Sequence, residues 1–224
     1  SRTGYVFAYW KNTAENKIVK VGEELTTTTV LTANWYKQND KGEITVPTQP
    51  DGEVVVKPDP NDPNKKPTVD KDGNVDVKPG GEVEKKPDGG TVVLPDGGKV
   101  EPDGTIKDDK GNTIDPDKPD SLPDGWYVVT YDANGGQGTM SKQTGKDLRA
   151  LENRYVYDGK SFTAWNTEKS GSGDVYNVGR VIKPAQDAKE ITLYAQWKSN
   201  ASTNPTISVD IVFYSDADKT ESAT

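Results

Sequence analysis

The most constraining feature of this sequence is a long stretch without aromatic residues. No Phe, Trp or Tyr occurs between Tyr36 and Trp126, and all five tryptophans lie outside this interval. Aromatic side chains supply much of the buried area of a protein core, so we expect the interval not to hold an ordinary globular core. Only 31% of the 224 residues are hydrophobic. The chain is therefore expected to consist of aromatic ends and a middle of a different kind.

Residues 50–120 differ in composition from the rest of the chain. They hold eleven of the fifteen prolines and 18 acidic residues against 11 lysines, which is typical of an extended, disordered linker. A short repeat argues for order, because a glycine is followed two or three residues later by Val or Ile and then usually by a turn with Pro or Asp. The units begin at Gly73, Gly81, Gly90, Gly98, Gly104 and Gly111.

One short strand and one turn per unit predict a thin solenoid-like β-repeat or chained hairpins, which only stacking can hold together. We therefore expect residues 50–120 to form an ordered β-stalk, with a flexible extended linker as the alternative. Residues 38–49 are mostly polar and are interpreted as a linker into this stalk.

Residues 126–198 carry the signals of a complete small β domain. WYVVTY at 126–131 and ITLYAQW at 191–197 are rich in aromatic and β-branched residues, which favour strands. DANGG at 132–136 predicts a turn, because Asn and Gly accept positive φ. Apolar residues recur at near-helical spacing between residues 175 and 182, so a helical turn or two is expected there.

The first 35 residues resemble the second half of this unit. The matching segments are FAYW at 7–10 with FTAW at 162–165, VGEEL at 21–25 with VGRVI at 178–182, and LTANW at 31–35 with LYAQW at 193–197. Residues 1–37 are therefore predicted to be half of a unit, and residues 126–198 the complete copy.

The end of the chain is similar to the start of the complete unit. IVFYS at 211–215 is similar to VVTYD at 128–132. We expect a linker at 199–205, then an isolated strand at 206–214 and a tail to residue 224. Two strands cannot bury a core alone, so we expect the strand at 206–214 to pair with residues 5–35, within the chain or from a neighbour.

The complete unit resembles the Listeria–Bacteroides repeat of internalin-type and other Gram-positive surface proteins. The resemblance rests on V-x-Y-D-A-N-G-G from Val129, F-x-x-W from Phe162 and L-Y-A-Q-W from Leu193. It implies a mainly β chain with a compact β-grasp-like domain of mixed sheet and a short helix, standing beside neighbouring repeats. It also implies an extracellular location, on the cell surface or attached to the cell wall, and a role in spacing and adhesion. The family has no universal ligand residues, so none is assigned here.

Aromatic residues supply the first candidate sites. Six are expected to anchor cores, with stacking on sugars as the alternative for the tryptophans: Phe7, Trp10, Trp35, Phe162, Trp165 and Trp197. Tyr157 and Tyr194 are expected to be more exposed. Together with the loop KSGSG at 169–173, they are the candidate contacts for a host surface protein or a glycan.

A weaker candidate is a calcium loop. DKDGNVD at 70–76 places Asp70, Asp72, Asn74 and Asp76 at alternate positions, as calcium loops do. The spacing departs from that of an EF-hand and no Glu stands at the bidentate position, so a solvated turn is the preferred interpretation. The acidic pairs at 108–109 and at 115 and 117 are interpreted in the same way. No other cofactor is expected.

Charge and composition exclude several functions. A net charge of −8 repels phosphate backbones and anionic lipid, so neither nucleic acid nor a membrane is an expected partner. No apolar run of about 18 residues exists to span a bilayer. The absence of Cys and His removes disulfides, thiol nucleophiles, imidazole bases and the usual zinc sites. No P-loop, nucleophile elbow or dinucleotide-binding fingerprint occurs, so we expect no enzyme activity.

The composition also suggests a source and a role. A cysteine-free, acidic sequence rich in Thr, Asn and Gly is typical of Gram-positive surface proteins, and Ser1 begins within a strand pattern, as a fragment of a longer protein does. We therefore predict a non-catalytic spacer segment of a bacterial cell-surface adhesin-like protein. The alternative is a binding module that acts on a host protein or glycan through residues 126–198.

Overall fold

The computed structural model describes residues 2–25, 29–48, 51–87 and 89–200. This part of the chain is mainly β, with one short 3₁₀ turn, η1, at Pro119–Ser121. The strands are β1 Tyr5–Asn12, β2 Lys17–Val19, β3 Leu31–Gln38, β4 Ile44–Thr48, β5 Gly52–Lys57, β6 Thr68–Val69, β7 Val75–Val77, β8 Gly81–Lys86, β9 Thr91–Leu94, β10 Gly98–Val100, β11 Ile106–Asp108, β12 Tyr127–Asp132, β13 Gln143–Gly145, β14 Lys160–Asn166, β15 Val175–Tyr176 and β16 Glu190–Ser199. The strand expected at 206–214 and the tail lie outside the described residues.

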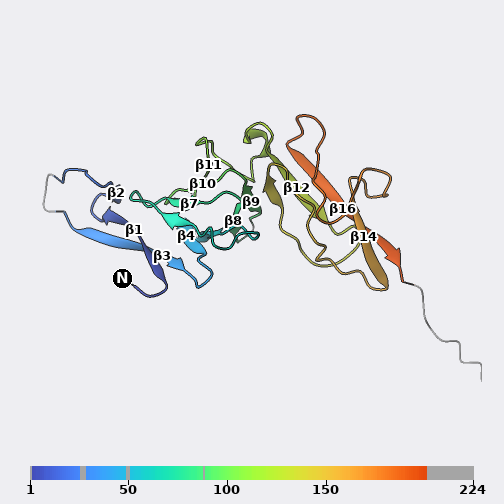
Figure 1. Ribbon diagram of the computed structural model, residues 1–224, viewed down its shortest axis with the longest axis horizontal. Coiled ribbons are helices and arrows are strands. Elements are labelled where there is room, and N and C mark those ends of the chain that lie inside the picture. The colour runs from blue at the N-terminus through green and yellow to red at the C-terminus, as the bar shows by residue number, and fades with distance from the viewer. Residues whose placement is uncertain (1, 26–28, 49–50, 88, 201–224) are drawn as a thin grey trace, which may run out of the picture.

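The strands form two open sheets. Twelve strands make one sheet in the order β15-β14-β16-β12-β13-β9-β8-β5-β4-β3-β1-β2, and four make a second in the order β11-β10-β7-β6. The large sheet runs along the molecule, with β1–β3 at one end and β14–β16 at the other (Figure 1). We call residues 5–38 the half unit, residues 44–114 the middle and residues 126–199 the complete unit.

The middle has a folded core without an aromatic residue of its own. The buried side chains come from both sheets: Ile44, Val46, Val54, Val56, Val83, Val92 and Leu94 from the large sheet, and Val75, Val77, Val100 and Ile106 from the small one. The expectation that an aromatic-free stretch holds no ordinary core was therefore wrong. Valine and isoleucine at alternate strand positions fill the space between two sheets, and Tyr36 and Trp126 join the same cluster from the flanks.

Pairing in the middle agrees with the chained hairpins that were expected as the alternative to a solenoid, and it corrects the linker expected at 38–49. The strands pair as antiparallel hairpins, β4 with β5, β6 with β7, β8 with β9 and β10 with β11. No solenoid is formed by the described residues of the stretch 50–120, and that part of it is folded rather than a flexible linker. The expected linker at 38–49 contains β4, whose Ile44 and Val46 are fully buried. Their alternation with Thr45 and Pro47 is a strand pattern.

The complete unit is a mixed five-stranded region of the large sheet. β12 lies parallel to β16 and antiparallel to β13, while β14 pairs with β16 and β15. The described residues of this unit contain no helix, so the β-grasp arrangement is not shown. The helical turn expected at 175–182 is instead β15 and a turn in which Gly179 has a φ of 80°. Trp165 pairs with Tyr176 and Asn166 pairs with Val175, and this short ladder to β14 holds β15 in an extended conformation.

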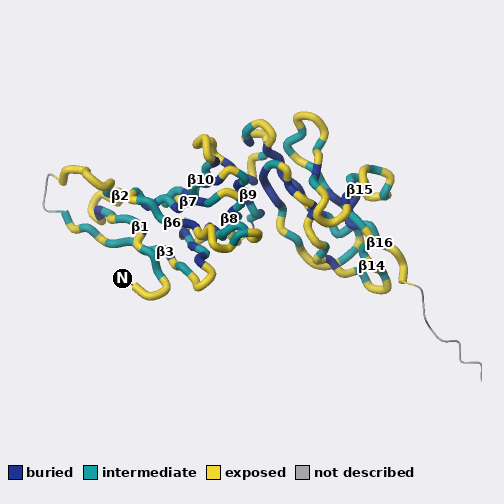
Figure 2. The backbone as a smooth tube through the Cα atoms, viewed as in Figure 1, coloured by how far each residue is buried: buried dark blue, intermediate teal, exposed yellow. Residues whose placement is uncertain are grey.

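β12 separates two cores. Its Val128 belongs to the core of the middle, whereas Tyr127, Val129 and Tyr131 belong to the core of the complete unit. Alternate residues of a strand point to opposite faces, so one strand serves both cores. Buried segments gather in the middle and the complete unit, while the half unit is mostly intermediate or exposed (Figure 2).

Candidate functional site

The core of the complete unit is built around Trp165. Its side chain is fully buried, and its Nε1 donates a hydrogen bond of 2.9 Å to the carbonyl oxygen of Leu151. Tyr131, Tyr155 and Phe162 pack against the ring of Trp165. Tyr157 packs against the nearby Trp197. These rings lie with their centroids 4.8 to 6.2 Å apart in tilted or edge-on geometry, which favours packing over open stacking on a sugar.

The tyrosines of this core also tie segments together. The hydroxyl of Tyr127 donates to the carbonyl of Ile182 (3.0 Å) and accepts from the N–H of Leu148 (2.9 Å). The hydroxyl of Tyr131 donates to Gln143 Oε1 (2.7 Å) and accepts from Leu151 N–H. Burial raises the pKa of both tyrosines, so they stay neutral donors.

The half unit repeats part of this cluster but leaves it open. Phe7 lies 5.5 Å from Trp10 and 5.5 Å from Trp35, as Phe162 lies 5.0 Å from Trp165 and 5.9 Å from Trp197. Trp10 is nevertheless 46% exposed and Phe7 37% exposed. The prediction that Phe7 and Trp10 are core residues was therefore wrong. The strands that cover Phe162 and Trp165 have no equivalent over the half unit among the described residues.

The two tyrosines proposed as ligand contacts lie on opposite faces of the complete unit. Tyr157 packs edge-on against Trp197 at 5.6 Å, with Lys160 Nζ 3.8 Å above its ring. Tyr194 lies on the other face of β16, since Trp197 and Tyr194 are an odd number of residues apart. Lys169 Nζ stands 5.4 Å from the Tyr194 ring. The structure thus groups Tyr194 with the loop at 169–173 and separates Tyr157 from both.

The loop at 167–174 is held by Asn166, a residue that sequence reasoning did not select. Its Nδ2 donates to the carbonyls of Gly171 and Gly173, both at 3.1 Å, and its Oδ1 accepts from the N–H of Glu168 and Gly173. Asn166 is buried and has all its hydrogen-bonding atoms engaged. Its place directly after the strand signal, before a Ser/Gly loop, is the sequence signal for such a role.

The calcium candidates form a turn instead. Asp70 Oδ1 accepts from the N–H of Asp72 (2.8 Å) and of Asn74 (2.9 Å), and its Oδ2 accepts from Asn74 Nδ2 (2.7 Å). Burial alone would raise the pKa of Asp70, but these hydrogen bonds hold it below its usual value. Asp108 makes the same three bonds with Lys110 and Asn112.

The two turns share the sequence D-x-x-G-N with a glycine at positive φ, 84° at both Gly73 and Gly111. One of these turns joins β6 to β7 and the other follows β11, so this turn accounts for the repeat units at Gly73 and Gly111. Asp72 lies beside Lys71 and Asp76 belongs to β7. In the described part of the chain, no group of three or more acidic residues is placed to hold a metal ion.

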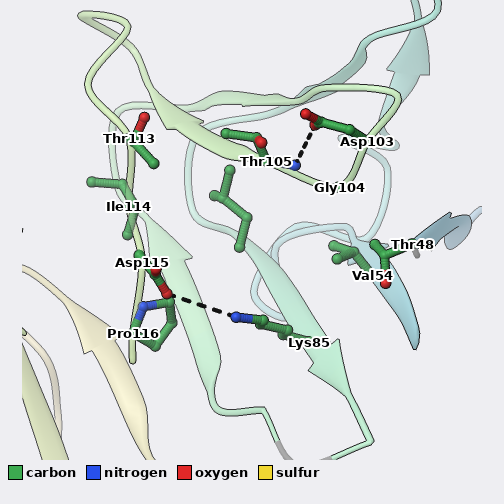
Figure 3. A pocket seen from close by; sticks show the side chains of 11 residues that line it. Thr48, Val54, Lys85, Asp103, Gly104, Thr105, Thr113, Ile114, Asp115 and Pro116 are labelled. Carbon is green, nitrogen blue, oxygen red and sulfur yellow. Dashed lines mark hydrogen bonds and ion pairs between the residues drawn. The ribbon is translucent and has the colours of Figure 1, made fainter. Parts of the chain in front are cut away.

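A hollow of about 260 Å³ lies in the middle, between the ends of β4 and β5 and the loops around β11 (Figure 3). Its charged groups are used by the fold. Lys85 Nζ lies 3.7 Å from Asp115 and 2.7 Å from Asp117, and the hydrogen bond to Asp117 raises the pKa of Lys85. Asp103 Oδ1 accepts from the N–H of Thr105 at 2.9 Å. Lys85 and Asp103 are thus both engaged by other groups of the fold.

Comparison with known proteins identifies the complete unit. Residues 127–196 match the family model of the Listeria-Bacteroides repeat domain, which confirms the resemblance argued from the sequence. This repeat is typical of bacterial surface proteins. The matched part of the chain is the complete unit; the half unit lies outside it.

Two relatives come from Evansella cellulosilytica. One, named "Putative Gly-rich membrane protein", is 36% identical over 80 residues, which are 33% of this chain and 9% of that protein. The other, named "Putative membrane protein", is 34% identical over 80 residues, 33% of this chain and 12% of that protein. The chain thus spans about a tenth of the length of these relatives. No solved structure matches the chain. Among the described residues, no helix is long and apolar enough to cross a membrane.

Proposed function

We propose that this chain is a non-catalytic spacer segment of a bacterial cell-surface adhesin-like protein, extracellular and attached to the cell surface or wall. The observation that supports this most directly is the continuity of the large sheet. A single run of twelve hydrogen-bonded strands joins the half unit, the middle and the complete unit. A continuous hydrogen-bonded sheet holds its two ends at a fixed distance from each other, as a spacer must.

The two junctions of the middle support a stiff connection. β9 pairs in parallel with β13 of the complete unit, and Asp117 binds both Lys85 (2.7 Å) and Lys142 (3.0 Å) beside this pairing. At the other end the hydroxyl of buried Tyr36 donates to the carbonyl of Gly73 at 2.9 Å. Neither junction is a free hinge of Gly and Ser residues.

Small-angle X-ray scattering on the monomer tests the spacer. Twelve strands at about 4.8 Å each span up to ~55 Å, so a rigid, elongated particle is expected, with a radius of gyration above the ~17 Å of a compact chain of this size. A broad, flexible profile, with a middle that extends toward the ~220 Å of an unfolded or polyproline-like stretch, would contradict the proposal.

A second candidate function is binding to a host protein or a glycan through the complete unit. The cluster of Tyr194, Lys169 and the loop held by Asn166 supports it, because a preformed loop beside an aromatic–cation pair suits recognition. A glycan array with the full chain tests it. Specific signals that are lost in Tyr194→Ala and kept in Tyr157→Ala would favour binding at this cluster. If the array gives no signal, binding to a glycan is contradicted and the spacer role is the one that stands for the complete unit.

A further inference from the structure

The chain enters and leaves the complete unit at opposite ends of one pair of strands. It enters at the start of β12 and leaves at the end of β16, and these two strands lie side by side in parallel. Their pairing begins with Val128 opposite Glu190 and ends with Asp132 opposite Tyr194. β16 ends at the far side of the molecule from the half unit (Figure 1). A pull on the chain at both sides of the unit therefore acts on β12 and β16 in opposite directions.

The dimensions of this pair set the direction in which such a pull acts. From Glu190 to Ser199 the strand β16 rises by about 30 Å, whereas β12 and β16 lie only ~4.8 Å apart. The line from entry to exit is therefore nearly parallel to the strands. Tension slides β12 along β16, so the residue pairs between the two strands are strained together rather than one after another.

β14 and β16 are arranged in the opposite way. They are antiparallel, and Lys160 at the start of β14 lies opposite Ser199 at the end of β16. A pull between these two neighbouring ends acts across the strands, so it separates one residue pair at a time from that end. The complete unit thus combines a strong and a weak direction of pulling in the same fold.

Two side chains extend the pairing of β12 and β16 beyond the last residue of β12. Nδ2 of Asn134 donates hydrogen bonds of 2.9 Å to the carbonyl oxygens of Ala195 in β16 and of Lys169. Nε1 of Trp197 donates a hydrogen bond of 2.9 Å to the carbonyl oxygen of Ala133. These bonds join the turn after β12 to the part of β16 that β12 does not reach. When β12 slides along β16, they are strained together with the main-chain ladder.

The ladder is also shielded from water on both faces of β12. Val128 lies in the core of the middle and is 1% exposed, whereas Val129 and Tyr131 lie in the core of the complete unit and are 0% and 5% exposed. The hydroxyl of Tyr155 donates a further hydrogen bond of 2.6 Å to the carbonyl oxygen of Tyr131. A hydrogen bond that breaks in a buried place is not replaced by one to water, so its loss costs more.

We propose that the complete unit bears tension along the chain, and that its mechanical clamp consists of the β12–β16 ladder with the side-chain bonds of Asn134 and Trp197. The proposal rests on the spacer function, because a spacer between a cell surface and an attached domain is pulled at both ends. Under such a pull the rate of unfolding determines how long the spacer stays folded. The clamp raises the barrier to unfolding for the direction of pulling that a spacer meets.

Single-molecule force spectroscopy with defined pulling points tests the clamp. The chain has no cysteine, so two introduced cysteines define where the handles attach. Asp124→Cys with Asn200→Cys pulls along the clamp, and Asp158→Cys with Asn200→Cys pulls β14 and β16 apart from one end. All three positions are exposed. At equal loading rate, the first axis should require at least about twofold more force, because it strains the whole ladder at once.

The length released on unfolding identifies the event on each axis. At ~3.3–3.6 Å per residue, the chain between residues 124 and 200 extends to about 250–270 Å, and the chain between residues 158 and 200 to about 140–150 Å. A single cooperative step that approaches the longer value is expected on the first axis. Release of the same length in several small steps at low force would contradict the clamp.

Two variants separate the clamp from general stability. Asn134→Asp removes the donor to Ala195, so it should lower the unfolding force on the first axis by a larger factor than on the second. Thr163→Val is the matched control, because Thr163 Oγ1 donates to the carbonyl oxygen of Gln196 at 3.1 Å and so joins β14 to β16. It should lower the force on the second axis and leave the first unchanged.

Equal forces on the two axes, or a first-axis force that both variants lower equally, would overturn the proposal. The comparison of axes changes only exposed positions, so it does not depend on the folding of either variant. Equal forces would leave the rigid particle expected in X-ray scattering unaffected. A flexible scattering profile, in contrast, would contradict the spacer function and leave the comparison of forces as it is.

Discussion

The half unit and the complete unit show what a shared strand register does and does not determine. Both place a phenylalanine, two tryptophans and a bulge in the same positions. Among the described residues, the complete unit alone adds β12, β13 and the segment with Tyr155, and its central tryptophan is the buried one of the two. The local sequence thus sets the pairing of two strands, whereas burial of their aromatic face depends on a third strand.

The largest expected difference between the units is at the central tryptophan. Trp165→Ala should reduce the free energy of unfolding of the complete unit by about 3–5 kcal/mol, because it empties a buried site. Trp10→Ala should cost the half unit no more than ~1–2 kcal/mol, since nearly half of that side chain is exposed. Segment-resolved hydrogen exchange on the full chain measures both. Equal losses would show that the half unit is covered in solution.

A second difference concerns tyrosine hydroxyls. Tyr127→Phe removes two hydrogen bonds inside the complete unit and leaves buried groups of Leu148 and Ile182 without partners. The loss should be about 1–3 kcal/mol. Tyr36→Phe removes one bond, to the carbonyl of Gly73, and should cost about 1 kcal/mol. Denaturant unfolding compares them. A larger effect for Tyr36→Phe would mean that the junction to the middle, rather than the aromatic core, dominates stability.

A third prediction sharpens the likeness of the two units. Gly22 and Gly179 occupy matching positions with φ of 88° and 80°, and an added Cβ would meet nothing within 4 Å at either. Alanine at each position should therefore cost about 1 kcal/mol through backbone strain alone. Thermal unfolding of the two single variants should give similar shifts. A clear inequality would contradict the structural equivalence of these turns.

The smallest effect is expected at the junction of the middle and the complete unit. Hydrogen bonds from Lys85 and then Lys142 lower the pKa of Asp117. A lowered folded-state pKa stabilises the protein above the unfolded value of about 3.9, and this contribution is lost as pH falls through the folded value. Because Asp117 is 53% exposed, the contribution should be below ~1 kcal/mol.

Comparison of the wild type with Asp117→Asn between pH 7 and acid isolates this contribution. The stability difference between the two proteins should shrink on acidification and with added salt. A stability difference that stays constant with pH would show that the ion pairs of Asp117 do not stabilise this junction.

Much of the complete unit could be predicted from its sequence. The strand signals at 126–131 and 191–197 and the turn after Asp132 correspond to β12, β16 and the tight turn in which Asn134 has a φ of 46°. Recognition of the half unit also followed from paired motifs. These features are local, so a short stretch of sequence contains them.

The remainder depended on contacts between distant segments. The core of the middle is formed by valines of two sheets that the sequence does not show to be adjacent. β4 was missed because its alternation is short and includes Pro47, which a strand tolerates at an edge or where its N–H is not needed. The exposure of Trp10 could not be predicted, because a strand pattern does not say whether its covering strand is present.

The candidate site was also partly predictable, in its local features and not in its contacts between distant segments. The phase of Tyr194 on β16 was evident from alternation, but the position of Tyr157 follows from its packing on Trp197, 40 residues away. Asn166 was overlooked since its four hydrogen bonds reach across a loop whose path the sequence does not define. The turn preferred over a calcium loop at residues 70–76 was the better interpretation, and calcium remained a weak alternative because the same oxygens that suit calcium also accept backbone N–H groups.

The most direct test of this account is native-state hydrogen exchange on the full chain, at a concentration where sedimentation shows a monomer. The amides of β14 and β16 should be protected at least about tenfold more strongly than the matching amides of β1 and β3, because only the former lie under a complete cover. Equal protection of the two pairs of strands in the monomer would contradict the claim that the half unit is open.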